Sequence, residues 1–535
     1  MRAQPLVYPR NGVSVGTSRD AADVLAAELA SAGTRLLFGL PGGGANLDVV
    51  GAAAAAGIGF VLTHDETAAC VMAGTHGLLT GSVGAAVVTR GPGVTNAATG
   101  LAQATLDRFP LLLVSDTVSS STASRVPHQR FDQVAMTAPI TKWAGVLGGS
   151  PDVARAAVAL ARRGPAGAVH LDLDVTAPGD VPPDLPARFP VDDAALADAR
   201  RLLAGSRHPV VIAGLEAAAA PGAGDALGRL GCPVLCTYQA KGVVPDGWPV
   251  AAGLFTNGAL ERPLLERADL ILAVGVDPVE PIPASWDHDA PVVMLHPAPV
   301  DGRYFGEPTV VLGPLETTLP SLVDVAEPRW EADAGALARK AGIEALEHQC
   351  AGLSPHDVVR ETARATPAGS TVTVDAGAHM LVVMPLWNAA RPQQVLISNG
   401  LATMGFALPA AIGAALARPA GPVVCFVGDG GLGMTMAELE TVSRLGLDVV
   451  VVVVNDAALS LIEIKQHDGQ GGAGAVRYGA TDFATVARGM GMPGCVVESA
   501  DSLRAQLSGG LRGPRLIDAR IDPAGYRHVI GVTRG

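Results

Sequence analysis

The sequence predicts an α/β protein with three doubly wound domains, each built on a parallel sheet. Short apolar runs of strand length alternate along the chain with alanine-rich stretches of helical spacing, which is the order of βαβ units. Several of these runs are continuous and β-branched, such as the six valines at 449–454, and such strands are buried on both faces of a sheet. At 535 residues, the chain is also too long for a single core, so three domains of ordinary size are expected.

The first domain is expected to cover residues 1–180. Thr17 or Ser18 can cap a helix that runs through Leu29, with apolar positions at helical spacing. The proline-rich stretch 178–186 carries no strand or helix signal and therefore predicts a linker. The strands expected before it are 36–38, 59–62, 85–89, 111–115 and 168–173.

Two further domains are expected at residues 190–328 and 350–535. The third domain resembles the first as an architecture, although no sequence repeat relates the two. A helix is expected in it at residues 434–445, between two strands. The strands expected in the second domain are 209–213, 233–237, 270–274 and 291–295, and those in the third are 371–374, 395–398, 423–427 and 449–454.

Two acidic residues follow neighbouring strands of the third domain. Asp429 stands in the glycine-rich stretch 427–431. Asp456 lies 27 residues after Asp429, just past the valine strand. Both should lie at the carboxyl ends of parallel strands, where open α/β sheets bind ligands. The glycines let backbone N–H groups approach a phosphate, and two carboxylates can hold a divalent cation beside it. The alternative is an ordinary βαβ turn in which the acids occur by chance.

This pair of acidic loops resembles the signature of thiamine diphosphate (ThDP) enzymes. The likeness is greatest to the branch of acetohydroxyacid synthase, pyruvate oxidase and benzoylformate decarboxylase. It extends over the whole chain, because further motifs of the family stand in its order and at about its spacing. These motifs are Phe38–Gly43, His64–Glu66, Gly91–Asn96 and Thr403–Gly405.

The resemblance implies that the third domain binds ThDP and Mg²⁺. Asp429 and Asp456 would ligate the metal together with the backbone carbonyl of Ala458. Asp456 departs from the family, because most relatives have asparagine there. Carboxylate oxygen remains a ligand that Mg²⁺ accepts, but the site gains a negative charge. Further cofactor-binding positions implied by the resemblance are Gly428, Gly430, Gly431, Leu459 and Ser460.

Two other segments resemble cofactor-binding parts of the family. Gly377 and His379 match the loop that touches the diphosphate, although His379 could also be a histidine satisfied within its own loop. Met404 matches the apolar residue under the bent cofactor, where an uncharged thioether fills an irregular gap. Ala402, often glycine in relatives, matches the residue whose carbonyl accepts a hydrogen bond from the cofactor amino group.

Glu66 matches the glutamate that activates the cofactor. It follows the strand 59–62 and opens a helix in the first, pyrimidine-binding domain. A carboxyl group in an apolar setting has a raised pKa and can share a proton with the cofactor pyrimidine. The alternative is a solvated glutamate at a helix N-terminus. In the family, this glutamate acts on the cofactor of the other subunit, so the resemblance implies an obligate homo-oligomer with active sites at the dimer interface.

Gln129 and Lys465 are the candidates for substrate recognition. Gln129 matches a glutamine of acetohydroxyacid synthases, with His128 in place of their aromatic residue. Lys465 stands where those enzymes carry a substrate-selecting tryptophan, and a lysine would favour an anionic or polar second substrate. An exposed lysine on a helix that also carries Glu463 explains Lys465 equally well.

No FAD is expected. The family's flavin-binding members carry a Gly-Met-His-Gly-Thr stretch and an arginine after a later Val-Gly pair. Here the corresponding stretches, 253–258 and 274–278, have lost both features.

The leading hypothesis is therefore a ThDP- and Mg²⁺-dependent enzyme acting on a small 2-oxo acid. It would decarboxylate the acid to an enamine and join this to a carbonyl acceptor, as acetolactate synthase does. Simple decarboxylation with release of an aldehyde is the second hypothesis, and the paired histidines of pyruvate decarboxylases are not evident. A non-catalytic homologue that only binds ThDP is the third, and the retained motif residues argue against it.

Composition narrows the class of protein. The net charge is −13 without a basic stripe, which argues against a nucleic-acid partner. No segment has 18 uninterrupted apolar residues, and the N-terminus lacks the apolar run of a signal peptide, so we expect no membrane span and a cytoplasmic location. The six cysteines stand mostly in apolar runs, which indicates reduced thiols.

Overall fold

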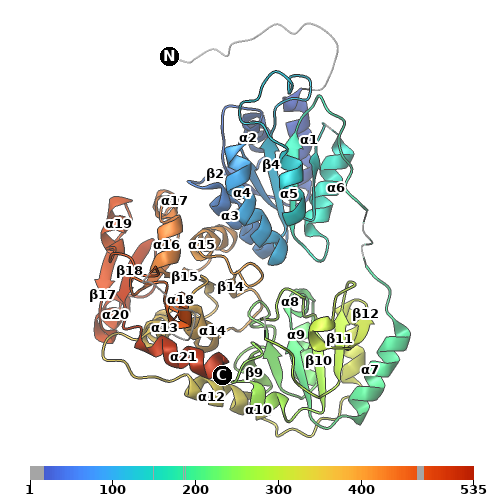
Figure 1. Cartoon of the computed structure of the whole chain (residues 1–535), viewed down its shortest axis with the longest axis vertical. Coiled ribbons are helices and arrows are strands. Elements are labelled where there is room, and N and C mark those ends of the chain that lie inside the picture. Colours follow the sequence, from blue (N-terminus) through green and yellow to red (C-terminus); the bar gives the residue numbers. More distant parts are fainter. Residues whose placement is uncertain are drawn as a thin grey trace.

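The computed structural model describes residues 17–148, 150–184, 186, 188–282, 284–466 and 475–534. Over these residues the chain forms three six-stranded sheets, and every pair of neighbouring strands is parallel. Helices cover the sheets, and the three units stand at the corners of a triangle (Figure 1). The predicted α/β fold with doubly wound parallel sheets is therefore confirmed.

The N-terminal unit has the strand order β2-β1-β3-β4-β6-β5. Its first helix begins as predicted, because Thr17 caps it and forms a capping box with Asp20. The elements of this unit are α1 (Ser18–Ser31), β1 (Leu36–Leu40), α2 (Asn46–Ala55), β2 (Gly59–Leu62), α3 (Glu66–Thr80), β3 (Gly84–Val88), α4 (Pro92–Leu106), β4 (Leu111–Asp116), α5 (Gln133–Thr137), η1 (Ala138–Ile140), β5 (Trp143–Val146), α6 (Pro151–Arg162) and β6 (Ala168–Leu173).

The central unit has the order β12-β11-β10-β7-β8-β9, which is that of a dinucleotide-binding sheet. The described residues between β6 and the first helix of this unit form no helix or strand, as the proline-rich linker predicts. Its elements are α7 (Asp193–Gly205), β7 (Pro209–Ala213), α8 (Leu215–Ala219), α9 (Ala223–Arg229), β8 (Val234–Cys236), β9 (Ala251–Leu254), α10 (Arg262–Leu265), β10 (Leu270–Val274), β11 (Val292–His296), η2 (Arg303–Phe305), β12 (Thr309–Leu312), α11 (Leu315–Val323) and α12 (Ala334–Ala345).

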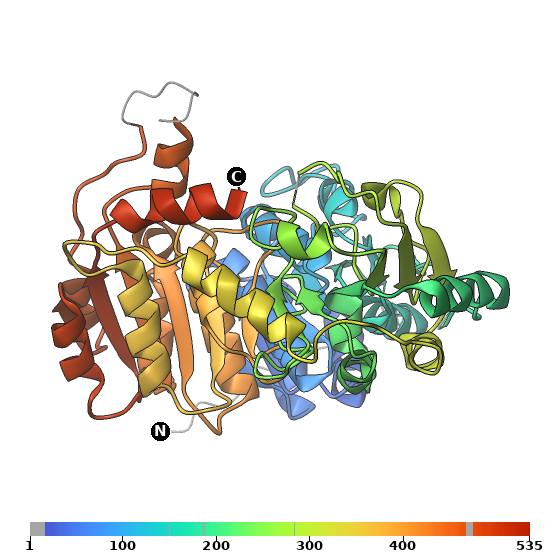
Figure 2. The same cartoon turned by 90° about the horizontal axis from the view of Figure 1, so that it is seen from below.

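The C-terminal unit repeats the topology of the N-terminal one. Its order, β14-β13-β15-β16-β18-β17, matches strand for strand when each unit is counted from its own first strand. The helix α21 lies across one end of these strands (Figure 2). The elements are α13 (Pro355–Ala365), β13 (Thr371–Val374), α14 (Met380–Leu386), β14 (Val395–Ile397), α15 (Ala407–Ala417), β15 (Val423–Gly428), α16 (Asp429–Thr435), α17 (Glu438–Arg444), β16 (Val449–Asn455), α18 (Ser460–Lys465), α19 (Phe483–Gly489), β17 (Gly494–Val497), α20 (Ala500–Leu507), β18 (Arg515–Arg520) and α21 (Ala524–Arg534).

The single helix predicted at residues 434–445 is wrong. Helix α16 already begins at Asp429, and a separate helix, α17, begins at Glu438. Glycines made the first of these look like a loop, since glycine is a poor helix former. The first residue of α17, the buried Glu438, accepts a 2.8 Å hydrogen bond from the backbone N–H of His64, which ties the start of this helix to the N-terminal unit.

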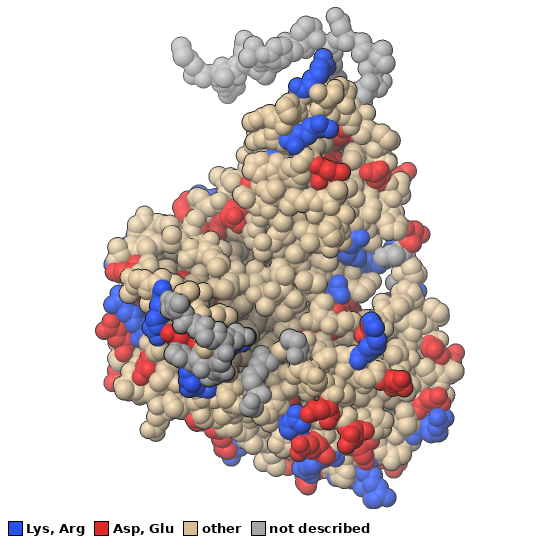
Figure 3. All heavy atoms as spheres, in the orientation of Figure 1, with Lys and Arg blue, Asp and Glu red and all other residues tan. Residues whose placement is uncertain are grey.

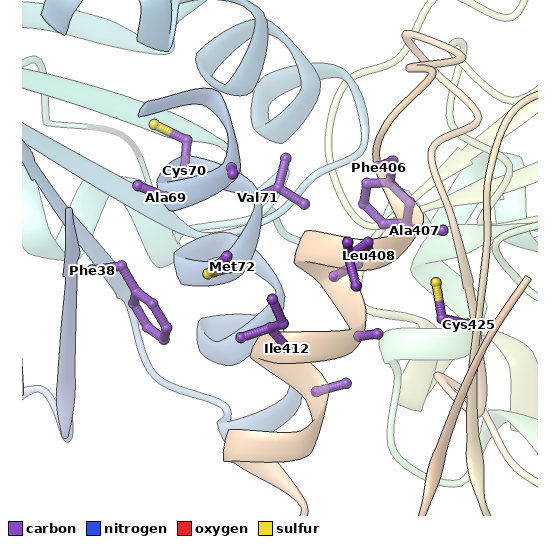
Figure 4. Packing of buried hydrophobic residues seen from close by; sticks show 14 of the residues in the cluster. Phe38, Ala69, Cys70, Val71, Met72, Phe406, Ala407, Leu408, Ile412 and Cys425 are labelled. Carbon is purple, nitrogen blue, oxygen red and sulfur yellow. The ribbon is translucent and has the colours of Figure 1, made fainter. Parts of the chain in front are cut away.

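The N-terminal and C-terminal units share one hydrophobic core. Helices α3 and α15 pack side by side, with Met72 and Val71 facing Phe406, Leu408 and Ile412 (Figure 4). The helices approach closely because a glycine lies in the contact. A Cβ atom on Gly413 would stand 2.5 Å from the carbonyl oxygen of Met72, so even a methyl group has no room there. We call this contact the α3–α15 seam.

Three global expectations can be compared with the structure. Among the described residues, no helix has both the length and the apolar content needed to cross a membrane. On the face shown in Figure 3, the described basic and acidic residues are intermixed and form no continuous basic stripe. All six cysteines belong to the described part of the chain and all are free; four are buried.

Candidate cofactor site

A cavity of about 230 Å³ opens at the carboxyl edge of the C-terminal sheet. Its walls come from the loops that follow β13, β14, β15 and β16, together with Tyr526 of α21. Strands β13 and β15 are neighbours from which the chain proceeds in opposite directions across the sheet. Open α/β sheets bind their ligands at such a switch point, outside the carboxyl ends of the strands.

The cavity collects every residue that the sequence suggested for cofactor and metal binding. They come from four separate segments and line one space. These residues are Gly377, His379, Ala402, Met404, Gly428, Asp429, Gly430, Gly431, Asp456, Ala458, Leu459 and Ser460.

Asp429 presents one carboxylate oxygen without a partner. It is the first residue of α16, and its Oδ1 accepts hydrogen bonds from the backbone N–H of Gly430 (2.8 Å) and from the hydroxyl of Tyr478 (2.9 Å). Its Oδ2 is buried and has no hydrogen-bond partner among the described residues. Burial raises the pKa of Asp429. A buried acceptor without a donor is costly, so a cation at Oδ2 would stabilise the site.

Asp456 is the second acid of the cavity. It follows β16, and its carboxylate accepts a hydrogen bond from Ser460. Burial, together with the charge of Asp429, raises the pKa of Asp456 to about 6. The preceding Asn455 is turned away, because its amide donates to the carboxylate of Asp518 at 2.8 Å. Of the two neighbours Asn455 and Asp456, it is therefore Asp456 that lines the cavity.

Glycines are required where other parts of the site come close. A Cβ on Gly431 would overlap the carboxylate of Asp375, and one on Gly430 would stand 2.9 Å from Leu459 Cδ2 and 3.3 Å from Met404 Cε. Gly377 has a φ of 154°, which side chains rarely adopt. The glycines of the acidic loop therefore allow several segments to meet at the cavity.

His379 is neutral and lacks one partner. The side chain is buried, and burial lowers its pKa to about 4. Its Nε2 atom has no hydrogen-bond partner among the described residues. This observation argues against a histidine that is satisfied within its own loop and leaves Nε2 free to bond with a ligand.

The loop 398–405 is fixed from two sides. The buried carboxylate of Asp375 accepts from the backbone N–H groups of Gly405 (2.9 Å) and Ala407 (3.1 Å). Asp107 of the N-terminal unit accepts from those of Asn399 (2.9 Å) and Gly400 (2.6 Å). Ala402 has a left-handed φ of 52° between these anchors. The carbonyl of Ala402 and the side chain of Met404 are thereby held at the cavity wall.

Glu66 lies in the N-terminal unit and does not line the cavity. It is the first residue of α3, and Asp65 caps this helix. The carboxylate is buried, and its Oε2 accepts a 3.1 Å hydrogen bond from the side chain of Asn96. Asn96 belongs to the motif 91–96, so the structure brings two of the sequence motifs together here.

Neither Gln129 nor Lys465 lines the cavity. Gln129 is exposed in the loop between β4 and α5 and has a positive φ of 54°. Lys465 is exposed at the end of α18. Glu463 forms a two-pronged ion pair with Arg477, with distances of 2.6 and 2.9 Å, and is therefore engaged elsewhere.

Two tyrosines of the site were missed by sequence reasoning. Tyr478 binds Asp429, and burial followed by the charge of Asp429 raises the pKa of its phenol, which keeps it a donor. Tyr526, on α21, is buried and lines the cavity. Neither belongs to a recognisable motif. The one sequence feature that could have drawn attention to them is that tyrosine is rare in this chain, which has only five.

The described residues contain no group of three or more histidine, cysteine or acidic side chains that could hold a metal by themselves. Asp429 and Asp456 supply only part of a shell for a hard cation, which takes six or more oxygen ligands. The residues therefore fit a cation that also takes a backbone carbonyl and oxygens of a bound phosphate. The glycine-lined wall beside Asp429 suits such a ligand.

Comparisons with known proteins agree with this geometry. The chain matches three models of thiamine pyrophosphate enzymes: the N-terminal TPP binding domain at residues 19–136, the central domain at 196–319 and the C-terminal TPP binding domain at 375–519. The last of these contains the cavity loops that follow β13, β15 and β16.

Curated relatives align along nearly the whole chain. Acetolactate synthase of Bacillus subtilis (strain 168) is 30% identical over 92% of each chain. Catabolic acetolactate synthase of Raoultella terrigena is 31% identical over 94% of this chain and 95% of its own. The large subunit of acetolactate synthase isozyme 3 of Escherichia coli (strain K12) is 29% identical over 95% of each. With three matched domains in order along the sequence, the chain belongs to the thiamine pyrophosphate enzyme family, which is that of the ThDP-dependent enzymes.

Proposed function

We propose that the protein is a ThDP- and Mg²⁺-dependent carboligase that decarboxylates a 2-oxo acid and joins the remaining fragment to a carbonyl acceptor. The observation that carries this proposal is the cavity, in which an unpartnered aspartate oxygen, a second acid and a glycine-lined wall meet. Relatives named acetolactate synthase, aligned along nearly the whole chain, support the choice of reaction.

The cavity residues bind and orient the cofactor. Asp429, Asp456 and the carbonyl of Ala458 would hold Mg²⁺, whose charge would offset that of the two acids and of the diphosphate. Neutral His379 can donate a hydrogen bond to a phosphate oxygen from Nε2 without adding charge. Met404 would lie under the cofactor, and the carbonyl of Ala402 would accept a hydrogen bond from the cofactor amino group. When bound, ThDP supplies a nucleophilic carbon and an electron sink.

Glu66 supplies the proton relay from a second copy of the chain. The carboxylate is buried beside Asn96, yet it does not line the cavity of its own chain. A two-fold dimer in which each N-terminal unit covers the partner's cavity would bring Glu66 to the cofactor. The protein is therefore proposed to be an obligate homo-oligomer with shared active sites.

The reaction is tested by product analysis. The purified protein, loaded with ThDP and Mg²⁺, is incubated with a panel of 2-oxo acids, with and without aldehyde or 2-oxo acid acceptors. Mass spectrometry should detect products that combine a decarboxylated donor with an acceptor. Release of the aldehyde alone under all conditions would replace the carboligase with a simple decarboxylase.

The protein should bind no flavin. In the central sheet, a dinucleotide's diphosphate would bind at the end of β7. The carboxylate of Glu280 already accepts there from the backbone N–H groups of Leu215 (2.9 and 3.0 Å) and Asp277 (2.8 Å). The buried carboxyl group of Glu280 thus occupies these backbone donors, which are then not available to a phosphate.

This expectation is checked by absorbance. Protein incubated with excess FAD and then desalted should be colourless, and acid denaturation should release no flavin. A stoichiometric yellow preparation would contradict it.

Lys465 is proposed to assist a carboxylate-bearing acceptor. It is exposed at the end of α18, and Leu461 and Ile462 of the same helix line the cavity. Its loss in Lys465→Ala should raise the acceptor KM by roughly 10- to 100-fold, the usual cost of one charge-assisted hydrogen bond. Decarboxylation of the donor in a single turnover should be unchanged.

The matched control is Lys340→Ala. Lys340 is exposed on α12, away from the cavity, and pairs with Glu344. If acceptor kinetics are the same in both variants and in the wild type, Lys465 is an ordinary surface lysine.

A further inference from the structure

Residues 475–478, which we call the return segment, contact three parts of the cofactor site. The backbone N–H of Leu459 donates to the carbonyl of Val476 at 2.8 Å, and that of Tyr478 donates to Ala457 at 3.3 Å. Ala458 and Arg477 form an antiparallel bridge between these bonds. The return segment therefore braces the loop that carries the carbonyl of Ala458.

The same segment reaches the other two parts through its side chains. Arg477 pairs with Glu463 on α18 by two hydrogen bonds. Tyr478 extends to the start of α16, where its hydroxyl donates to Oδ1 of Asp429 at 2.9 Å. Gly430 permits this approach, because a Cβ at that position would stand 3.0 Å from the phenol oxygen.

The phenol determines which oxygen of Asp429 remains available. The terminal torsion of an aspartate is broad, so its carboxylate can rotate unless hydrogen bonds hold it. Here Oδ1 accepts from both Tyr478 and the N–H of Gly430, whereas the buried Oδ2 has no partner among the described residues. Two donors on one oxygen fix the carboxylate plane and leave the second oxygen for a ligand.

We propose that Tyr478 is a positioning residue for the metal site, which holds Asp429 so that Oδ2 is presented to a divalent cation. This inference rests on the proposed function of the cavity. Partners that orient metal ligands in this way typically contribute about 10- to 100-fold to metal affinity. The return segment extends the effect to the Ala458 carbonyl, since both ligands are braced by the same four residues.

The test measures metal binding rather than turnover. Full-length wild type and Tyr478→Phe are freed of metal and cofactor, and Mn²⁺ is titrated in the presence of ThDP while the free ion is followed by electron paramagnetic resonance. The Kd for Mn²⁺ should rise about 10- to 100-fold in Tyr478→Phe. The melting temperature of the apoprotein should stay that of wild type, because phenylalanine fills the same volume.

Tyr304→Phe is the matched control, because Tyr304 lies in η2 of the central unit and does not line the cavity. Its Kd for Mn²⁺ should equal that of wild type. A second measurement is the affinity for ThDP at saturating metal, which Tyr478→Phe should recover if the defect lies in metal binding. An unchanged Kd for Mn²⁺, or a loss of ThDP affinity that persists at saturating metal, would overturn the role of Tyr478. A wild-type protein that binds neither ThDP nor Mn²⁺ would instead refute the proposed function.

Discussion

Asp429→Ala should abolish Mg²⁺-dependent binding of ThDP. The change removes a metal ligand and leaves the charge of the diphosphate without its counter-ion. The loss should exceed the roughly 100-fold cost of removing a residue that only orients a ligand. Isothermal titration of the apoprotein with ThDP, at fixed Mg²⁺, measures it directly.

Asp456→Asn serves as the control for this prediction. Its amide oxygen can still ligate Mg²⁺ and accept the hydrogen bond of Ser460, so ThDP binding should be retained. The substitution also removes one of two neighbouring negative charges. If Asp429→Ala binds ThDP as tightly as the wild type, the metal site lies elsewhere.

Glu66→Gln should bind ThDP normally and lose most of its turnover. The amide keeps the shape of the side chain but cannot share a proton with the cofactor. Proton transfer by a positioned side chain typically contributes about 100- to 10,000-fold, which is the expected loss. Steady-state turnover and exchange of the cofactor's acidic C–H proton with deuterium, followed by NMR, give two independent readouts.

Mixing the two inactive variants tests where Glu66 acts. If Glu66 serves the cavity of the partner, a hybrid dimer of Glu66→Gln and Asp429→Ala contains one site with both defects and one intact site. Activity should therefore reappear after the variants are mixed and allowed to exchange subunits. Near-normal turnover of Glu66→Gln alone would remove this residue from the mechanism, and inactive hybrids would place it in the site of its own chain.

The sequence predicts the buried part of this fold well. Continuous apolar strands, such as the valines of β16, and glycines beside an acid carry their own signal, so the sheets and the acidic loops were found. Strand β5 spans only four residues, of which three are partly buried and one is buried, and in β18 Asp518 and two arginines interrupt the apolar residues. Asp518 is buried in the strand because it binds Asn455, a partner 63 residues away.

The parts of the site that were missed depend on distant contacts. Helix α17 begins at Glu438, which is bonded to His64, 374 residues away in the chain. Tyr478 reaches Asp429 only because the chain folds back past Ala457. Such contacts leave no local periodicity, and a single tyrosine has no spacing that would mark it.

The α3–α15 seam has a consequence for how catalysis could change during evolution. Helix α3 begins with Glu66, and α15 begins three residues after Met404. The packing of these two helices therefore fixes the distance between Glu66 and Met404 within one chain. Because Gly413 leaves no space for a methyl group against Met72, even a small substitution at this position would push the two helices apart. In a two-fold dimer the same spacing would be repeated in the partner chain. Substitutions would then be tolerated at the edge of the cavity, where they can change substrate choice. Substitutions in the α3–α15 seam would be selected against.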